Sequence, residues 1–218
     1  MVSKIQNNMK RREKVAFYTS PKIQAILIDI QDILERYSSE FEVKNIKIQP
    51  LHQDLHMQKI LYNKVNGEYN FCFIDFEGDP QIPLEEKKQK FPIEKDLGSF
   101  LRSLSYIKFD VLHNFIEKRL IGKDEYRVPE EFLFSLYFRK AAQISQKDKV
   151  LESILYLLNQ WERSMMNRIF DKTIKVNFTL INYFTIERAL HELDYELLYR
   201  PHKLIIPILG LKELIERV

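Results

Sequence analysis

The chain has 218 residues, of which 45% are hydrophobic and 30% are charged, a balance typical of folded globular proteins and not of disordered ones. Lysine and arginine (34) exceed aspartate and glutamate (31) by only three, so no strongly charged polymer such as a nucleic acid is expected as a partner. The one cysteine, Cys72, excludes an internal disulfide framework and a cysteine-based zinc site. No apolar run is long enough to span a bilayer, so we expect a soluble, cytoplasmic protein.

The glycines exclude two common nucleotide sites. Five are present, and they cannot be written as G-x-G-x-x-G or as G-x-x-x-x-G-K-[ST]. A Rossmann dinucleotide site and a P-loop are therefore not supported.

Near the N-terminus, residues 1–18 are polar and basic, and we expect a loose arm or a docking segment there. A helix is predicted to follow. Ser20 is a candidate N-cap, Pro21 suits the first helical position, and apolar residues recur at helical spacing as far as Tyr37.

The next segment predicts a small amount of β structure. A short strand is expected at 43–49, and two further strands at 60–63 and 69–76. The last two are joined through Asn66-Gly67, a dipeptide typical of tight hairpin turns. Cys72, within the second of these strands, is expected to be a buried thiol.

The rest of the chain is predicted to be helical. A loop with a solvated charge run spans 79–92, and an apolar stripe then predicts a long helix from Leu97 to Ile116. Further helices are expected at about 129–145, 148–170, 178–199 and 208–217. No internal linker appears, so we expect one compact, mostly helical α+β unit.

Two acidic motifs border the predicted hairpin. His52–His56 (H-Q-D-L-H) precedes its first strand, and Ile74–Pro80 (I-D-F-E-G-D-P) ends its second. Asp54 can orient or deprotonate a hydroxyl group, while Asp75 and Glu77 share one face of a strand and can hold Mg²⁺. Acids at such fixed positions are what a phosphotransferase of protein-kinase-like shape requires.

These two motifs resemble the H-G-D-x-H and I-D-F-E-G-E-P motifs of maltokinases, which are relatives of the aminoglycoside phosphotransferases. The likeness keeps its order from about residue 45 to the C-terminus. The further matching stretches are Pro83–Lys87, Asp96–Ser103, Trp161–Glu162, Glu192–Glu196, Arg200–Pro201 and Ile206–Pro207.

The resemblance implies ATP-dependent phosphorylation of a sugar, in that family of maltose to maltose 1-phosphate, with ATP and Mg²⁺ as cofactors. The candidate catalytic residues are Asp54, as the base, with His52 and Lys59. Asp75 would be the principal metal ligand and Glu77 the second, both also serving the nucleotide cofactor. His52 also has a plainer interpretation, because histidines in such loops commonly serve packing and hydrogen bonding.

By the same resemblance, four residues near the C-terminus would bind the sugar: Glu192, Tyr195, Glu196 and Arg200. The first three lie at i, i+3 and i+4 and share a helix face, so amphipathic packing explains Tyr195 equally well. Asp96, at a helix start, would accept hydrogen bonds from backbone N–H groups of the catalytic loop.

The chain departs from the family pattern at five positions. Lys59 stands where the family has a metal-binding Gln or Asn, and a charged lysine cannot ligate Mg²⁺. It can either contact a phosphate in place of an ion or leave the site unable to hold metal–ATP. Gln53 and Gln58 stand in place of glycine in the catalytic loop, which makes the loop backbone less free. Lys203 and His191 replace aromatic residues and bear on sugar specificity.

The resemblance covers only a C-terminal lobe, since the roughly fifty residues before His52 are too few for an ATP-binding lobe. We therefore expect a basic arm (1–18) and a kinase-like C-lobe (19–218), with a catalytic loop (50–63), a metal-loop hairpin (69–80) and a helical body (94–218).

Two functions remain open. The chain is either the catalytic lobe of a sugar kinase that pairs with an N-lobe chain or forms a homo-oligomer, or a pseudokinase-like module. Such a module would bind sugar or serve as a scaffold in trehalose or glycogen metabolism. A lobe built to face another lobe should expose an apolar patch.

Overall fold

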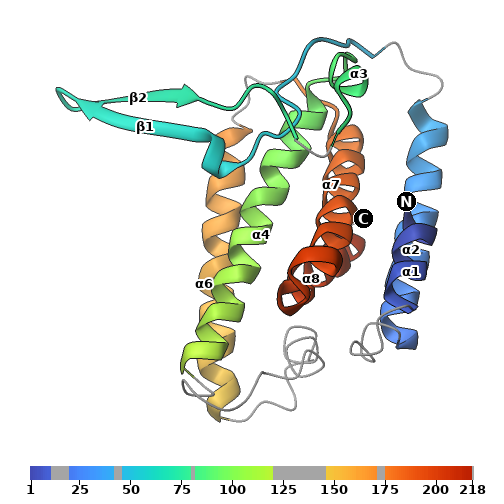
Figure 1. Cartoon of the computed structure of the whole chain (residues 1–218). Coiled ribbons are helices and arrows are strands. Elements are labelled where there is room, and N and C mark those ends of the chain that lie inside the picture. Colours follow the sequence, from blue (N-terminus) through green and yellow to red (C-terminus); the bar gives the residue numbers. More distant parts are fainter. Residues whose placement is uncertain (11–19, 42–45, 80–81, 120–145, 171–174, 218) are drawn as a thin grey trace. The chain divides into compact units, whose positions relative to one another are not determined.

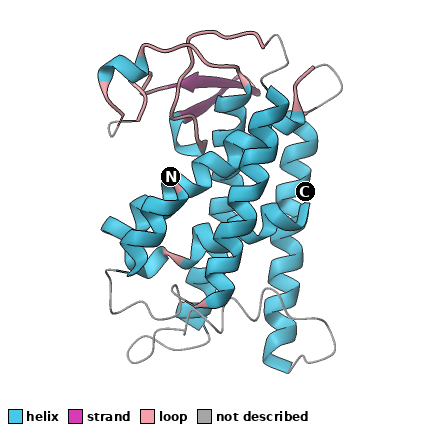
Figure 2. Cartoon of the chain, turned by 90° about the vertical axis from the view of Figure 1, so that its right-hand side faces the viewer, coloured by secondary structure: helices cyan, strands magenta, loops and turns pink. Residues whose placement is uncertain are grey.

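The computed structural model describes residues 1–10, 20–41, 46–79, 82–119, 146–170 and 175–217. Helices dominate this part of the chain (Figure 2). The main helices are α1 (Val2–Lys10), α2 (Pro21–Phe41), α4 (Glu94–Arg119), α6 (Gln146–Ile169), α7 (Phe178–Tyr199) and α8 (Ile205–Arg217). The shorter elements are strands β1 (Ile60–Val65) and β2 (Glu68–Phe73), helix α3 (Leu84–Lys87) and the 3-10 turns at Met57–Lys59 and Pro201–Lys203. The predicted fold class, α+β and mostly helical with a small β-hairpin, is confirmed.

Among the described residues, no helix combines the length and the apolar character that crossing a membrane requires.

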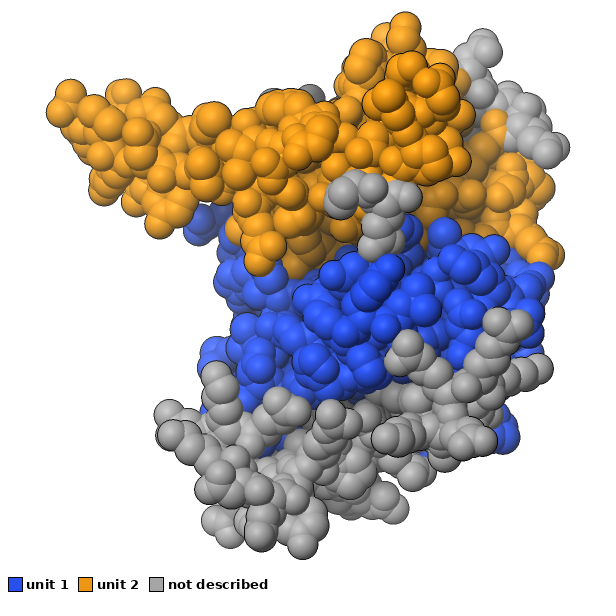
Figure 3. All heavy atoms as spheres, viewed as in Figure 1, with its two compact units in different colours: residues 1–33, 105–174, 189–218 blue, residues 34–104, 175–188 orange. Residues whose placement is uncertain are grey.

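The chain divides into two compact units and not into the single unit expected from the absence of a linker (Figure 3). Unit 1 takes residues 1–33, 105–174 and 189–218, and unit 2 takes residues 34–104 and 175–188. Because each unit gathers segments that are distant in sequence, a composition-based search for linkers has no boundary to detect.

The β-hairpin of unit 2 is antiparallel, with Ile60 opposite Phe73 and Val65 opposite Glu68 (Figure 1). Asn66 and Gly67 form its two-residue turn with positive φ angles of 53° and 87°, as the Asn-Gly signal predicts. Strand β2 ends three residues earlier than predicted. Asp75 adopts a φ of 61°, and this left-handed conformation cannot continue an extended strand.

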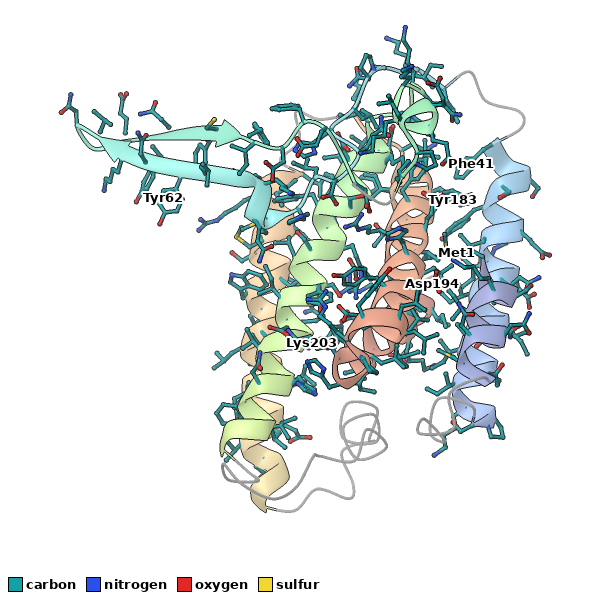
Figure 4. The ribbon with its side chains drawn as sticks, viewed as in Figure 1. Met1, Phe41, Tyr62, Tyr183, Asp194 and Lys203 are labelled. Atoms are coloured by element: carbon teal, nitrogen blue, oxygen red, sulfur yellow. The ribbon has the colours of Figure 1, made fainter. Side chains whose placement is uncertain are left out.

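One face of the hairpin is rich in aromatic side chains. Because alternate residues of a strand share a face, the register places six side chains together: Ile60, Tyr62, Lys64, Tyr69, Phe71 and Phe73. The Tyr69 ring lies 6.2 Å from that of Tyr62 and 6.5 Å from that of Phe71. Tyr62 is 70% exposed and Phe71 66% exposed (Figure 4), so this aromatic face is a surface of unit 2.

Cys72, on the opposite face of β2, is exposed, so the prediction of a buried thiol was wrong. A strand pattern indicates which residues share a face. It does not indicate whether a second layer covers that face, and both strands of this hairpin are exposed.

Elsewhere in unit 2, the start of α4 packs closely against α7. Thr185 Oγ1 donates a hydrogen bond to the Gly98 carbonyl oxygen over 3.4 Å, and Glu94 accepts one from the backbone N–H of Asn177 over 3.1 Å. The Phe41 and Tyr183 rings meet edge to face with centroids 5.4 Å apart (Figure 4).

The Gly98→Ala substitution is expected to lower the free energy of unfolding by about 1–3 kcal/mol, because overpacking forces the backbone to shift. A Cβ at position 98 would lie 2.9 Å from both the Thr185 backbone nitrogen and the Phe184 Cβ. Urea unfolding measures the effect. Alanine within a helix ordinarily stabilises by about 0.5–1 kcal/mol relative to glycine, so an increase in stability would contradict this close contact.

Unit 1 has its own apolar core, built from the later part of α4 with α6 and α8. Its buried members are Phe109, Leu112, Ile116, Leu151, Ile205, Ile206 and Leu209. Phe109, Leu112 and Ile116 belong to the apolar stripe predicted for the helix from Leu97 to Ile116, so this part of the stripe faces the core.

Of the segment 1–18, for which a loose arm or a docking segment was expected, residues 2–10 form helix α1 and residues 11–18 lie outside the described residues. In helix α1, Val2, Ile5 and Met9 are buried. On its polar side, Lys4 and Asn8 donate hydrogen bonds to the carboxylate of Asp194, over 2.6 Å and 3.1 Å (Figure 4).

Three further expectations have mixed outcomes. Of the strand predicted at 43–49, residues 46–49 are described and contain only an isolated bridge between Gln49 and Phe91. Ser20 precedes α2, but its buried hydroxyl has no hydrogen-bond partner, so it does not cap the helix through its side chain. The helix predicted at 129–145 lies outside the described residues.

Candidate functional site

The candidate catalytic loop is held at its start by the carboxylate of Asp96, at the beginning of α4. Asp96 accepts hydrogen bonds from the backbone N–H groups of His52 over 2.8 Å and of Gln53 over 2.9 Å. All three residues are buried. The role that the resemblance implies for Asp96 is confirmed, and such charge-assisted hydrogen bonds are among the stronger ones in proteins.

The ring of His52 ties the same loop to the end of β2. Its Nε2 lies 2.7 Å from the carbonyl oxygen of Ile74, and because a carbonyl can only accept, Nε2 must carry the proton. The ring also lies 5.1 Å from that of Phe76. This geometry gives His52 a positioning role for the loop that carries Asp54.

The backbone is strained at two non-glycine positions beside the site. Gln53 has a φ of 62° and Asp75 a φ of 61°, in a region that side chains with a Cβ rarely adopt. The Gln53 side chain compensates in part, since its Nε2 donates to the Lys87 carbonyl oxygen over 2.6 Å. Gln53 thus adopts the backbone conformation that a glycine would reach without strain.

Asp54 is buried beside the basic side chains of Arg188, Lys59 and His56. Arg188 donates a 2.9 Å hydrogen bond to its Oδ1, while Lys59 Nζ and His56 Nε2 lie 3.8 and 3.7 Å from its Oδ2. Burial raises the pKa of Asp54, but the hydrogen bond from His56 and the charges of Arg188, His56 and Lys59 outweigh it, so the pKa is lowered overall. The carboxylate is therefore ionised at neutral pH.

Arg188 is a site residue that the sequence did not reveal. It lies on α7, 134 residues after Asp54, and also reaches Asp79 over 3.4 Å. The match of H-Q-D-L-H identified Asp54 by its neighbours, whereas Arg188 stands in no motif and reaches the site only through packing. Asp79, quoted within the I-D-F-E-G-D-P motif but given no role, is buried and belongs to the same ion-pair group.

Lys59 Nζ is hydrogen-bonded to Asp75 Oδ2 over 2.6 Å. This hydrogen bond raises the pKa of Lys59, burial lowers it, and the charges of Asp75, Asp54 and Glu77 raise it further, so the net shift is upward. The structure thus brings Lys59 together with Asp54 and Asp75, and the charge of Glu77 also acts on Lys59.

Oxygen donors for a divalent cation would have to come from Asp75 and Glu77. Nowhere in the described ranges do three or more histidine, cysteine, aspartate or glutamate residues form a group able to hold a metal. One oxygen of Asp75 already binds the Lys59 ammonium. The residues as arranged do not fit a cation between Asp54 and Asp75.

The four candidate sugar-binding residues belong to unit 1. Glu196 Oε1 accepts hydrogen bonds from Tyr106 and from Arg200, each over 2.7 Å, and the Arg200 guanidinium lies 4.8 Å from the centre of the Tyr195 ring. Glu196 is buried, and burial raises its pKa despite the favourable hydrogen bond from Tyr106 and charge of Arg200. Glu192 lies one helical turn before Glu196 on α7 and is partly buried.

Replacement of the Asp96 carboxylate should release the catalytic loop. We expect Asp96→Ala to lower the free energy of unfolding by about 2–4 kcal/mol, since two buried N–H groups lose a charged acceptor. Asp96→Asn keeps one acceptor oxygen and should cost less. The measurement is chemical denaturation. The matched control is Glu85→Ala, which removes an exposed carboxylate paired with Lys88 and should cost under about 0.5 kcal/mol. Equal losses in the Asp96→Ala and Glu85→Ala variants would contradict the role of Asp96.

No family model matches the chain. The solved structures that share its fold include a glucosamine kinase in complex with glucosamine, ADP and inorganic phosphate, and glucosamine kinase in two crystal forms, A and B. Each is 16% identical to this chain, with TM-scores of 0.55, 0.56 and 0.55 for the complex, form B and form A. The matches cover 99–100% of this chain but only 46–47% of the glucosamine kinases, so the chain spans less than half their length. At the level of the fold, the chain is therefore similar to sugar kinases.

Proposed function

We propose that this chain is the proton-accepting, sugar-binding lobe of an ATP-dependent, maltokinase-like sugar phosphotransferase, and that a separate chain supplies the ATP-binding lobe. The observation that supports this proposal most is the environment of Asp54. Its loop is held by Asp96, its carboxylate is oriented by Arg188 over 2.9 Å, and its pKa is lowered. An ionised, oriented carboxylate is the group that a hydroxyl needs before it attacks phosphorus.

In the proposed reaction, a sugar hydroxyl oxygen forms a bond to the terminal phosphorus of ATP while the bond from that phosphorus to the ADP oxygen breaks. The hydroxyl proton passes to Asp54. The low pKa of Asp54 keeps it deprotonated before the reaction, so that it can accept the hydrogen bond of the hydroxyl in the ground state. Arg188 keeps the carboxylate in one orientation, and such positioning provides most of the catalysis in phosphoryl transfer.

The proposed sugar contacts are Glu192, Tyr195, Glu196 and Arg200. Carboxylates and a guanidinium group pair with sugar hydroxyls, and an aromatic ring can stack on the C–H face of a sugar ring. The resemblance of the motifs favours maltose. One structural neighbour is in complex with glucosamine. A carboxylate such as Glu192 could also pair with the amino group of glucosamine.

The proposed partner docks on the aromatic face of the hairpin. Four aromatic side chains of this face are exposed, namely Tyr62, Tyr69, Phe71 and Phe73. An isolated two-stranded hairpin is only marginally stable in water, and exposed patches of this kind commonly mark protein interfaces. Since the chain matches less than half of each glucosamine kinase, we take the occupant to be a chain that carries the remaining, ATP-binding half.

The test mixes this chain with a candidate partner encoded beside it, ATP, divalent cation, and either maltose or glucosamine. Phosphorus NMR follows the appearance of ADP and of a sugar phosphate. The proposal predicts product only when both chains are present. Absence of product with every neighbouring candidate, across common mono- and disaccharides, would contradict it.

A second candidate is a non-catalytic module that binds sugar or serves as a scaffold for an enzyme of trehalose or glycogen metabolism. The specific observation in its favour is the ion pair between Lys59 and Asp75, which neutralises the proposed metal ligand. If the chain is such a module, calorimetry should show that the isolated chain binds sugar. The two-chain mixture should then form no sugar phosphate.

A further inference from the structure

The Lys59 ammonium stands between two carboxylates of unit 2. Its Nζ lies 2.6 Å from Asp75 Oδ2 and 3.8 Å from Asp54 Oδ2. The Lys59 side chain is only 20% exposed, which sets it apart from the surface lysines of the same unit, such as Lys88 at 61%. It is therefore a built part of the site.

The backbone on both sides of this ion pair is held in place. The Lys59 N–H donates to the His56 carbonyl oxygen over 2.9 Å, and the Lys59 carbonyl oxygen accepts from the Ile74 N–H over 3.0 Å. The second bond joins the residue directly before Asp75 to Lys59 itself. The left-handed φ of Asp75, 61°, then directs its side chain away from the path of an extended strand. These backbone bonds fix the main-chain positions of Lys59 and of the residue before Asp75, so the two side chains start from neighbouring points.

A divalent cation at Asp75 would compete directly with this ammonium. Mg²⁺ demands oxygen atoms at about 2.0–2.1 Å in near-octahedral geometry and repels a positive charge placed beside it. Asp75 Oδ2 is already bound to the Lys59 ammonium. The neighbouring acids do not draw Lys59 away from Asp75, because they have a cation of their own. Asp79 faces Arg188, and Arg188 also holds Asp54.

We propose that Lys59 is the resident cation of this site and that it excludes a divalent metal ion from Asp75. The inference concerns the same site as the proposed function and rests on it only in taking Asp75 as the carboxylate that would bind the metal. It assigns Lys59 a role as an internal competitor for that carboxylate. Removal of its charge should then create a metal site that the unaltered chain lacks.

The experiment measures Mn²⁺ binding to the whole chain by electron paramagnetic resonance and calorimetry, without ATP, sugar or partner. Lys59→Gln removes the charge and adds a carbonyl oxygen that can ligate a hard cation, whereas Lys59→Met removes the charge alone. We expect Lys59→Gln to bind Mn²⁺ at least about tenfold more tightly than the unaltered chain, and Lys59→Met to show a smaller gain.

Two controls locate the effect. Lys64→Gln makes the same charge change at a hairpin lysine that lies 5.1 Å from the centre of the Tyr69 ring, and it should leave Mn²⁺ affinity unchanged. Adding Asp75→Asn to Lys59→Gln should abolish the gain. Equal affinity of Lys59→Gln and the unaltered chain would overturn the inference, whether both bind or neither binds.

A measurement on the unaltered chain covers the case in which the variants unfold. Mn²⁺ at low concentration should leave the amide NMR signals of Asp75 and Gly78 sharp, and selective broadening of these signals would overturn the inference. Failure of the proposed function looks different, since the two-chain mixture would then form no sugar phosphate while the Lys59→Gln variant still gained Mn²⁺ affinity.

Discussion

Asp54→Asn is expected to lower the rate of sugar-phosphate formation in the two-chain mixture by about 10²- to 10⁴-fold, the usual contribution of a positioned general base. Asparagine keeps the size of the side chain and an oxygen toward Arg188, but it cannot take the hydroxyl proton. Sugar affinity should change little, because Asp54 is not one of the four residues proposed to bind the sugar. Initial rates and calorimetry measure the two quantities separately.

The matched control for this substitution is Asp32→Asn, which makes the same charge change at an exposed position of α2 and should leave the rate unaltered. The two-chain mixture with the unaltered chain should also show no loss of rate between pH 5 and pH 8 that is due to Asp54, since the pKa of Asp54 is lowered from its ordinary value of 3.8. A variant Asp54→Asn that keeps most of the rate would show that Asp54 is not the base.

Lys108→Met should be the most destabilising of the proposed substitutions, with an expected loss of about 3–5 kcal/mol in the free energy of unfolding. The Lys108 side chain is fully buried in unit 1, and its Nζ lies 2.7 Å from Glu162 Oε2 and 2.6 Å from Glu213 Oε1. Methionine matches its length but removes the ammonium that both carboxylates share, while Arg217 stays 2.9 Å from Glu162. An uncompensated buried charge is the physical cost.

Urea denaturation checks this prediction, and a compensating variant tests its cause. Neutralising both carboxylates together with the lysine (Lys108→Met, Glu162→Gln, Glu213→Gln) should recover much of the loss, since buried ion pairs replaced as a set are often close to neutral. Lys212→Met, which breaks a 3.5 Å pair with Glu216 near the surface of α8, is the control and should cost under about 1 kcal/mol. If Lys108→Met cost no more than Lys212→Met, the buried charge would not be a stabilising feature.

Much of the local structure could be predicted from the sequence, because it depends on residues close together in the chain. Helix α7 spans 178–199 as its pattern predicted, and the Asn66-Gly67 turn adopts the positive φ angles for which those two residues are suited. The match of one motif to a family also identified the cap of the catalytic loop by Asp96. In each case, the local structure depends on the types of residues within a short stretch of the chain.

The tertiary structure decided which side chains meet across long stretches of chain. Arg188 reaches Asp54 only because α7 packs within unit 2, and the pairing of Lys59 with Asp75 depends on the hairpin bond between Lys59 and Ile74. The exposure of Cys72 depends equally on whether another layer covers the hairpin. The sequence by itself determined the elements and the acids they carry, whereas only packing determined which charges neutralise those acids, because that depends on distances that no local pattern encodes.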